Sequence, residues 1–323
     1  MTKMGKVVRI GTRESQLALW QATQVKDLLN TFEVTSELVP IKSDGDIDLK
    51  TPLYEMGVQG IFTRSLDIAL LNKRIDIAVH SMKDVPTQLA SGIAQAAVLK
   101  RGNPKDLLVY KGDLETLNQS LSYPEKNESI KGNKHFIIAT SSIRRKAQWL
   151  HRYPDHAIEN LRGNVNTRMQ KLKDQNWNAA IFAAAGLERI SLRPGNSIEL
   201  DWMLPAPSQG AIMVVCREED NESLDICKNL NDDNTAICAK IERDFLRTLL
   251  GGCSTPIAAL AEIEEDELFF RGNILTPDGI KKAEVEKILP LENLMNLGRD
   301  SADELLLSDD GQEIMQLIRY AKK

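Results

Sequence analysis

The sequence predicts an α/β protein with two similar lobes and a small C-terminal α+β domain that contains an antiparallel sheet. Apolar segments of strand length alternate with amphipathic segments of helix length, which is typical of a largely parallel sheet covered by helices. Residues 8–20 and 136–149 share one order of features: a strand, a threonine turn, a polar cap and a helix. From residue 257 the pattern changes to antiparallel strands with a tight turn.

The first lobe begins with a buried strand at residues 7–12. Ser15 is expected to cap the helix that follows, because a serine hydroxyl accepts a hydrogen bond from an amide in the first turn of a helix. The apolar face of this helix is formed by Leu17, Ala18, Ala22, Val25, Leu28 and Leu29. After it we expect a strand at 33–41, a helix at 60–74 and strands at 75–81 and 93–99. Residues 101–106 are interpreted as a hinge into the second lobe.

The second lobe repeats this order, and Ser142 stands where Ser15 stands in the first. Residues 156–174 and 178–190 continue the alternation of strand and helix. The stretch 204–216 contains two prolines and an apolar strand, and is interpreted as the return of the chain to the first lobe. Two similar α/β lobes joined by crossing strands predict a ligand cleft between them, at strand ends and helix N-termini.

The last third of the chain differs in character. A helix is expected at 235–250, ended by Gly251 and Gly252. One face of this helix carries Ile237, Ile241, Phe245 and Leu249. Antiparallel strands at 257–279 and two amphipathic helices complete the domain, whereas the polar stretch 113–134 is expected to be a surface excursion.

The composition is that of an ordinary globular enzyme, with 42% hydrophobic and 27% charged residues. A net charge of −5 disfavours nucleic-acid binding through bulk electrostatics. The N-terminus has no apolar leader segment, and no apolar run approaches the length of a transmembrane helix. We therefore expect a cytosolic location, with neither nucleic acid nor membrane as a partner.

Cys253 is the one cysteine that stands on a predicted loop, between a pair of glycines and a proline. Its thiol could be a nucleophile or a covalent anchor. Cys216, Cys227 and Cys238 lie in apolar segments and are expected to be inert. No cysteine has metal-ligand spacing and the four histidines are scattered, so we expect no metal site and no Cys–His hydrolase.

Asp84 and Lys83 follow a buried strand directly. A carboxylate at such a strand end can stabilise a cation or move a proton, but the residues by themselves slightly favour a helix N-cap or a surface ion pair. His80 is interpreted as a packed strand residue. Arginines at strand ends of both lobes predict a polyanionic ligand, although any single one could belong to a solvated helix face. They are Arg13, Arg144, Arg145, Arg162, Arg168 and Arg189.

Several motifs resemble the hydroxymethylbilane synthase (porphobilinogen deaminase) family across essentially the whole chain. They are IGTRESQLAL, IDIAVHSMKDVPT, ATSSIRRKAQ, LRGNVNTRMQKL, AAAGLERI, QGAI and GGCSTPIA. The resemblance implies a cytosolic, monomeric transferase of haem biosynthesis. Such an enzyme joins four porphobilinogen molecules head to tail on a covalent dipyrromethane primer, releases ammonia at each step and frees hydroxymethylbilane by hydrolysis.

The resemblance also implies an architecture. The first two lobes of the family resemble type II periplasmic-binding-protein lobes. Carried onto this chain, the domains are residues 1–101 with 210–229, then 106–205, then 232–323, and the third carries the cofactor cysteine.

The family's site residues can be matched one by one to this sequence. Cys253 matches the cysteine that holds the primer through a thioether, and Asp84 matches the catalytic aspartate, which stabilises an azafulvenium cation. The resemblance assigns cofactor binding to Lys83, Arg144, Arg145, Ser142, Thr140 and Ser81. It assigns substrate binding to Arg13, Ser15, Arg162, Arg168 and Arg189.

The sequence departs from the family in two places. In the stretch 54–67, which resembles a lid loop, Glu55 and Gln59 stand where many relatives carry lysines. The segment APSQGA also differs from a commoner version that contains a further glycine.

Two other functions are open to the same residues. A solute-binding module could share the fold without catalysis. The missing leader segment and the GGCSTP loop disfavour it. An enzyme that uses a cysteine nucleophile on acidic substrates is the second, and the absence of a well-placed histidine disfavours it.

Overall fold

A computed structural model describes residues 7–42, 63–121, 136–249 and 255–321 of the chain. The chain divides into two compact units. Unit 1 consists of residues 1–49, 58–104 and 208–240, and unit 2 of residues 50–57, 105–207 and 241–323. Within the described residues, no helix combines the length and the apolar character needed to cross a membrane.

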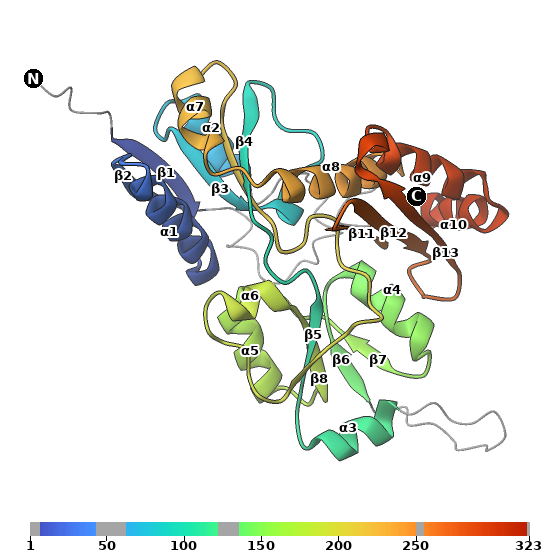
Figure 1. Ribbon diagram of the computed structural model, residues 1–323. Helices are drawn as coiled ribbons and strands as arrows, with labels where there is room; N and C mark the ends of the chain where they lie inside the picture. The colour runs from blue at the N-terminus through green and yellow to red at the C-terminus, as the bar shows by residue number, and fades with distance from the viewer. Residues whose placement is uncertain (1–6, 43–62, 122–135, 250–254, 322–323) are drawn as a thin grey trace, which may run out of the picture. The chain divides into compact units, whose positions relative to one another are not determined.

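Unit 1 contains one five-stranded sheet. Its strands are β1 (Val8–Arg13), β2 (Ser36–Ile41), β3 (Ile77–Ser81), β4 (Ile93–Leu99) and β10 (Ile212–Arg217) (Figure 1). Its helices are α1 (Gln16–Thr31), α2 (Arg64–Leu71), the 3-10 turn η2 (Met82–Asp84), α7 (Asn221–Lys228) and the first part of α8 (Asp233–Thr248). The strand order is β2-β1-β3-β10-β4, in which β1 is parallel to β2 and β3, and β10 is antiparallel to both of its neighbours. The carboxyl ends of β1 and β3 therefore lie at one edge of the sheet.

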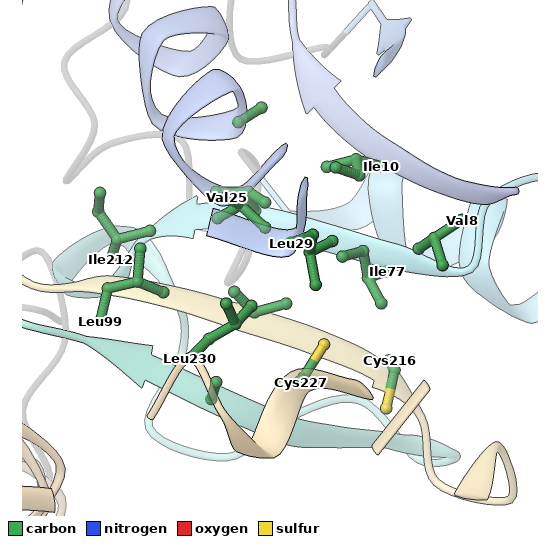
Figure 2. Close-up of a cluster of buried hydrophobic side chains, with 14 residues drawn as sticks. Val8, Ile10, Val25, Leu29, Ile77, Leu99, Ile212, Cys216, Cys227 and Leu230 are labelled. Carbon is green, nitrogen blue, oxygen red and sulfur yellow. The ribbon is translucent and has the colours of Figure 1, made fainter. Parts of the chain in front are cut away.

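Helices cover both faces of this sheet. On one face, Val25 and Leu29 of α1 pack with Ile77 of β3 and with Cys227 of α7 (Figure 2). On the other face, residues of α2 such as Leu66 pack against β3 and β10. Because both faces are covered, β3 is apolar at successive positions rather than at alternate ones.

Unit 2 contains a second five-stranded sheet. Its strands are β5 (Asp106–Tyr110), β6 (Ile137–Ala139), β7 (Ala157–Glu159), β8 (Ala179–Ala183) and β9 (Ser197–Glu199), and its helices are α3 (Leu114–Leu121), α4 (Ile143–Arg152), α5 (Val165–Asp174) and α6 (Ala184–Glu188). The order is β7-β6-β8-β5-β9, with β6 parallel to β7 and β8, and β5 antiparallel to β8 and β9. In both sheets the first strand of the repeat is flanked by the next two, and an antiparallel strand follows. The predicted repeat is confirmed.

The third described sheet, also in unit 2, is antiparallel and has the order β11-β12-β13. Its elements are β11 (Ile257–Glu264), β12 (Glu267–Leu275), β13 (Lys282–Pro290), the turn η3 (Leu291–Asn293), α9 (Leu297–Leu307) and α10 (Asp309–Ala321). The helices α9 and α10 lie against this sheet (Figure 1). The second part of α8 also packs here, where the rings of Phe245 and Phe270 meet edge to face with centroids 5.3 Å apart. The predicted fold class, two α/β lobes and a small α+β part, is confirmed.

Three local expectations were wrong in detail. Ile237 is 39% exposed, although Ile241, Phe245 and Leu249 are buried. Residues four apart on a helix drift by about 40° for each step, so three steps turn Ile237 away from the face that Leu249 occupies. Leu28 is exposed at the edge of the apolar face of α1. The polar stretch 113–134 is not wholly an excursion, because α3 forms in it and buries Leu117 in the core of unit 2.

The two crossing segments meet within unit 1. The amide of Gly102 donates to the carbonyl of Gly210 at 3.0 Å, and Gln209 Nε2 donates to the carbonyl of Pro104 at 2.7 Å. Gly210 has a φ of +87°, and a Cβ atom there would lie 2.6 Å from the Gly102 oxygen, so glycine is required. The return of the chain through 204–216 to the first sheet is confirmed by the place of β10. The division into three domains stays a prediction.

A buried ion-pair cluster ties the strands of unit 1 together. Asp76, directly before β3, accepts from Arg9 Nε and Nη2 of β1 at 2.9 Å each. Arg217 of β10 lies 3.7 Å from the same carboxylate and also pairs with Asp220. Only 1% of the Asp76 side chain is exposed, so its charge is compensated by these arginines rather than by water.

Replacing Asp76 by alanine is expected to lower the free energy of unfolding by about 1.5–3 kcal/mol, because Arg9 loses two side-chain hydrogen bonds to a charged partner and Arg217 keeps only Asp220. Urea unfolding followed by circular dichroism measures the change. The control is Asp225→Ala, which removes an ion pair whose side chains are 72% and 69% exposed, and should cost less than about 0.5 kcal/mol. Equal stability of the two variants would contradict the assignment.

Candidate active site

The predicted site residues of unit 1 gather at the edge formed by the carboxyl ends of β1 and β3. Arg13 ends β1 and Ser81 ends β3, and these two strands are direct neighbours. Ser15 caps α1 as predicted, with its Oγ accepting from the amide of Ala18 at 3.3 Å. Gln21 of α1 reaches back and exchanges hydrogen bonds of 2.9 and 3.1 Å with the Ser81 hydroxyl.

Lys83 and Asp84 form the 3-10 turn η2 directly after β3. Lys83 Nζ donates to Gln209 Oε1 at 3.2 Å, which connects this turn to the crossing segment. The Asp84 side chain is half-buried, and among the residues that the structure describes its carboxylate makes no hydrogen bond and no ion pair. Within the same residues, neither a helix cap nor an ion pair accounts for it. Its oxygens remain available to a ligand.

His80 lies within β3, opposite Met213 of β10, and its side chain is buried. Burial, with a smaller contribution from the nearby charge of Arg13, lowers the pKa of the ring to about 4. The ring is therefore neutral at physiological pH. Its Nε2 atom has no hydrogen-bond partner within the described part of the chain. These features agree with the interpretation of His80 as a packed strand residue.

In unit 2 the predicted residues gather at the carboxyl ends of β6, β7 and β8. Ser142 caps α4 as predicted, accepting from the amide of Arg145 at 3.4 Å. Thr140 is buried, and its Oγ1 accepts from the Ser142 amide at 3.2 Å. Ser141 Oγ accepts from the Leu161 amide at 2.9 Å and so joins this turn to the loop after β7.

The next two predicted arginines are Arg162 in that loop and Arg168 in the helix that follows it. Arg162 is buried, and Arg168 in α5 donates from Nε to the carbonyl of Gly163 at 2.7 Å. Gly163 has a φ of +113°, and a Cβ atom there would lie 2.7 Å from Thr167, so only glycine fits the approach to α5. Arg189 follows α6, and burial lowers the pKa of its guanidinium to about 10. It remains protonated at neutral pH.

Both edges suit anions. The first turns of α1, α4 and α5 contain no acidic residue, so the positive ends of these helices are not neutralised by their own side chains. Arginines stand beside each of them. Chemically, the unit 2 edge can bind carboxylates, and the unit 1 edge adds a carboxylate of its own that can accept from N–H groups.

Arg144 and Arg145 share a partner that the sequence analysis missed. Both are buried and pair with Asp106, the first residue of β5, at 2.8 and 2.7 Å. From the sequence, Asp106 is interpreted only as the last residue of the hinge 101–106. One signal was available, because an acidic residue that opens a fully apolar strand needs a buried partner. Gln21 and Gln209, which bond to Ser81 and Lys83, were also missed, and nothing in the sequence around them indicates these contacts.

The remaining predictions concern the cysteines, the stretch with Glu55 and Gln59, and metal ligands. Cys253, Glu55 and Gln59 lie outside the described residues. Burial raises the pKa of Cys216 to about 11 and that of Cys227 to about 12, which agrees with their expected inertness. Cys238 is also buried. No cluster of potential metal ligands occurs in the described parts of the chain.

Two family models match the chain. Residues 8–225 match "Porphobilinogen deaminase, dipyromethane cofactor binding domain", and residues 236–307 match "Porphobilinogen deaminase, C-terminal domain".

Solved structures give weaker similarities. The methionine binding protein MetQ has 13% identity and a TM-score of 0.42, and covers 71% of this chain and 91% of its own. The VFT2 domain of BvgS from Bordetella pertussis has 12% identity and a TM-score of 0.40, over 71% of this chain and 90% of its own. A putative L-cystine ABC transporter from Listeria monocytogenes has 12% identity and a TM-score of 0.37, over 70% of this chain and 89% of its own.

Acidification is expected to destabilise the fold through His80. The pKa of its ring is about 4 in the folded protein and 6.5 ordinarily, so between these pH values the unfolded chain binds a proton that the folded chain does not. The free energy of unfolding should therefore fall as the pH falls, by up to about 1.4 kcal/mol per pH unit. Urea unfolding of the native protein and of His80→Asn at several pH values measures the two slopes. Identical slopes would remove His80 from this effect.

Proposed function

Because the chain belongs to the porphobilinogen deaminase family of transferases, we propose that it joins four porphobilinogen molecules head to tail on a dipyrromethane primer. Ammonia leaves at each step, and hydrolysis frees the linear hydroxymethylbilane. Dipyrromethane is the cofactor that the matched N-terminal domain binds. The observation that carries the proposal is Asp84, a half-buried carboxylate with no partner among the described residues, next to an edge rich in hydrogen-bond donors.

The residues present fit the cofactor chemically. Each pyrrole ring carries an acetate and a propionate, which call for cationic donors, and a ring N–H, which calls for an acceptor. The donors proposed to hold the primer are Lys83, Ser81, Thr140, Ser142, Arg144 and Arg145, and the acceptor is Asp84. Cys253 is proposed to anchor it through a thioether. When bound, the primer supplies a nucleophilic pyrrole carbon.

Asp84 is proposed to act on the incoming substrate. The bond between carbon and the departing amine breaks with both electrons on nitrogen, so positive charge develops on the pyrrole. A carboxylate near the ring N–H stabilises that charge and can accept the proton released when the new carbon–carbon bond forms. Gln21 and Gln209, which bond to Ser81 and Lys83, support the donors around it.

The predicted arginines that are not paired with Asp106 are proposed to bind the substrate's carboxylates. Arg13 and the helix start at Ser15 supply one set of donors in unit 1. Arg162, Arg168 and Arg189 supply another in unit 2. Because a growing chain gains two carboxylates with each ring, donors in excess of those needed for one substrate are expected.

We also propose that the protein is a cytosolic monomer with three domains, residues 1–101 with 210–229, 106–205 and 232–323. The interval between the two matched family domains, from 225 to 236, supports the last of these boundaries.

Asp84→Asn is expected to lower the rate of hydroxymethylbilane formation by about 10²–10⁴-fold, because the charge that faces the developing cation is removed. The fold should be unaffected, since the carboxylate has no partner among the described residues. Turnover and thermal unfolding of both proteins test this. Asp27→Asn, an exposed change on α1, is the control and should have normal activity. Near-normal turnover in Asp84→Asn would exclude Asp84 from catalysis.

The intact mass of the purified protein, measured under denaturing conditions, is expected to exceed the chain mass by two linked pyrroles, located on the peptide that contains Cys253. Cys253→Ser should lack the adduct and turnover, whereas Cys227→Ala should retain both.

An unmodified chain would be incubated with porphobilinogen and weighed again. Gain of the adduct would show that the chain had been isolated without its primer. Continued absence would favour the solute-binding module. A Cys253→Ser protein that loses turnover but keeps the adduct would favour the cysteine nucleophile.

A further inference from the structure

Asp106 holds two arginines of unit 2 at once. Its carboxylate is fully buried, with Oδ2 accepting from Arg144 Nη2 at 2.8 Å. Oδ1 accepts from Arg145 Nη2 at 2.7 Å and from Arg145 Nε at 3.2 Å. Each arginine has a second anchor, because Arg144 Nη1 donates to the Leu204 carbonyl at 2.7 Å and Arg145 Nη1 to the Ile181 carbonyl at 2.9 Å. Both guanidinium groups are therefore fixed in orientation.

The charges in this cluster do not cancel. Among the ion pairs of the described residues, two guanidinium groups face the one carboxylate of Asp106, which leaves a net positive charge in a buried place. Burial lowers the pKa of Arg144, while the charge of Asp106 acts in the opposite direction. An anion that enters this site would complete the balance.

The cluster also keeps unused donors. A guanidinium carries five N–H bonds, of which Arg144 uses two and Arg145 three. Arg144 Nε is buried and makes no hydrogen bond within the described residues. A carboxylate could therefore bind to this pair without displacing Asp106.

The position of α4 itself does not depend on Asp106. Gln148 exchanges two hydrogen bonds of 2.9 Å with the main chain of Leu204. On the far side, His151 Nδ1 bonds to the carbonyl of Gly279 at 2.8 Å. A Cβ atom at Gly279 would lie 2.5 Å from the Ala147 oxygen, so the turn between β12 and β13 sits directly on the helix. Loss of Asp106 would change the orientation of the two guanidinium groups more than the place of the helix.

We propose that Asp106 is a positioning residue, which orients Arg144 and Arg145 so that their unused N–H bonds receive carboxylates of the dipyrromethane primer. This inference rests on the proposed function. Asp106 acts through the arginines and does not touch the primer.

The test uses protein isolated without primer and measures how fast porphobilinogen adds the mass of two pyrroles. Asp106→Asn keeps the shape and removes the charge, and should slow loading by up to about 100-fold, because misplaced binding groups lose much of their effect. Asp174→Asn, an exposed change on α5 of the same unit, is the control and should load at the native rate.

A double-mutant cycle separates positioning from a general structural role. In an Arg144→Gln/Arg145→Gln background, Asp106→Asn should have no further effect on loading, because the groups through which it acts are gone. If Asp106→Asn slows loading in this background by the same factor as in the native protein, Asp106 acts independently of the arginines, which would overturn the inference. Loading of Asp106→Asn at or above the native rate would also overturn it, and would identify Asp106 as a competitor of the primer.

Asp106→Glu covers the case in which Asp106→Asn does not fold. It keeps the charge but displaces both guanidinium groups, so it should load more slowly while remaining folded at the assay temperature; native loading would contradict the inference. The native protein run in parallel distinguishes the two proposals. If it gains no adduct, the proposed function fails, whereas equal loading of native and variant proteins leaves that function intact and removes only the role of Asp106.

Discussion

In both units a buried carboxylate is shared by two arginines that lie far from it in the sequence. The two sets are Asp76 with Arg9 and Arg217, and Asp106 with Arg144 and Arg145. An uncompensated buried charge is strongly destabilising, so the Asp76 set holds β1 and β10 to the start of β3, whereas the Asp106 set holds two guanidinium groups of α4 whose helix has further anchors of its own. The two sets lie at opposite ends of the parallel strands of their own sheets. Asp76 precedes β3, whereas Asp106 faces Ala183 at the carboxyl end of β8. The same interaction thus joins strands in one unit and orients two guanidinium groups of α4 in the other.

The functional edges follow from strand direction. Parallel strands end together, so turns that are far apart in the chain, such as those after β1 and β3, place their polar residues side by side. The helices that begin there have no acidic residue in their first turns, and their amide groups face the same region as the arginines. An acidic protein can in this way gather arginines at two sheet edges while keeping a net charge of −5. The Asp84 carboxylate has no partner within the described part of the chain, which distinguishes it from the paired carboxylates of Asp76 and Asp106.

Features set by neighbouring residues could be predicted from the sequence. Ser15 and Ser142 cap their helices because the bond they make spans three residues, and the repeated lobes followed from the alternation of strands and helices. Contacts between distant residues could not be predicted. The bond from Lys83 to Gln209 spans 126 residues, and that from Arg144 to Asp106 spans 38. Ile237 failed because a spacing of four only approximates the helical repeat.

The turn between β12 and β13 touches α4 through a glycine whose missing side chain makes the contact possible. The contact includes the hydrogen bond between His151 Nδ1 and the Gly279 carbonyl, but its closeness depends on shape, so any substitution at Gly279 would push the turn off the helix whatever its polarity. Glycine would therefore be required at position 279 for steric reasons, independently of any charge or catalytic role. The contact also couples α4, which carries Arg144 and Arg145, to the three-stranded sheet, so that a displacement of the sheet would displace the helix.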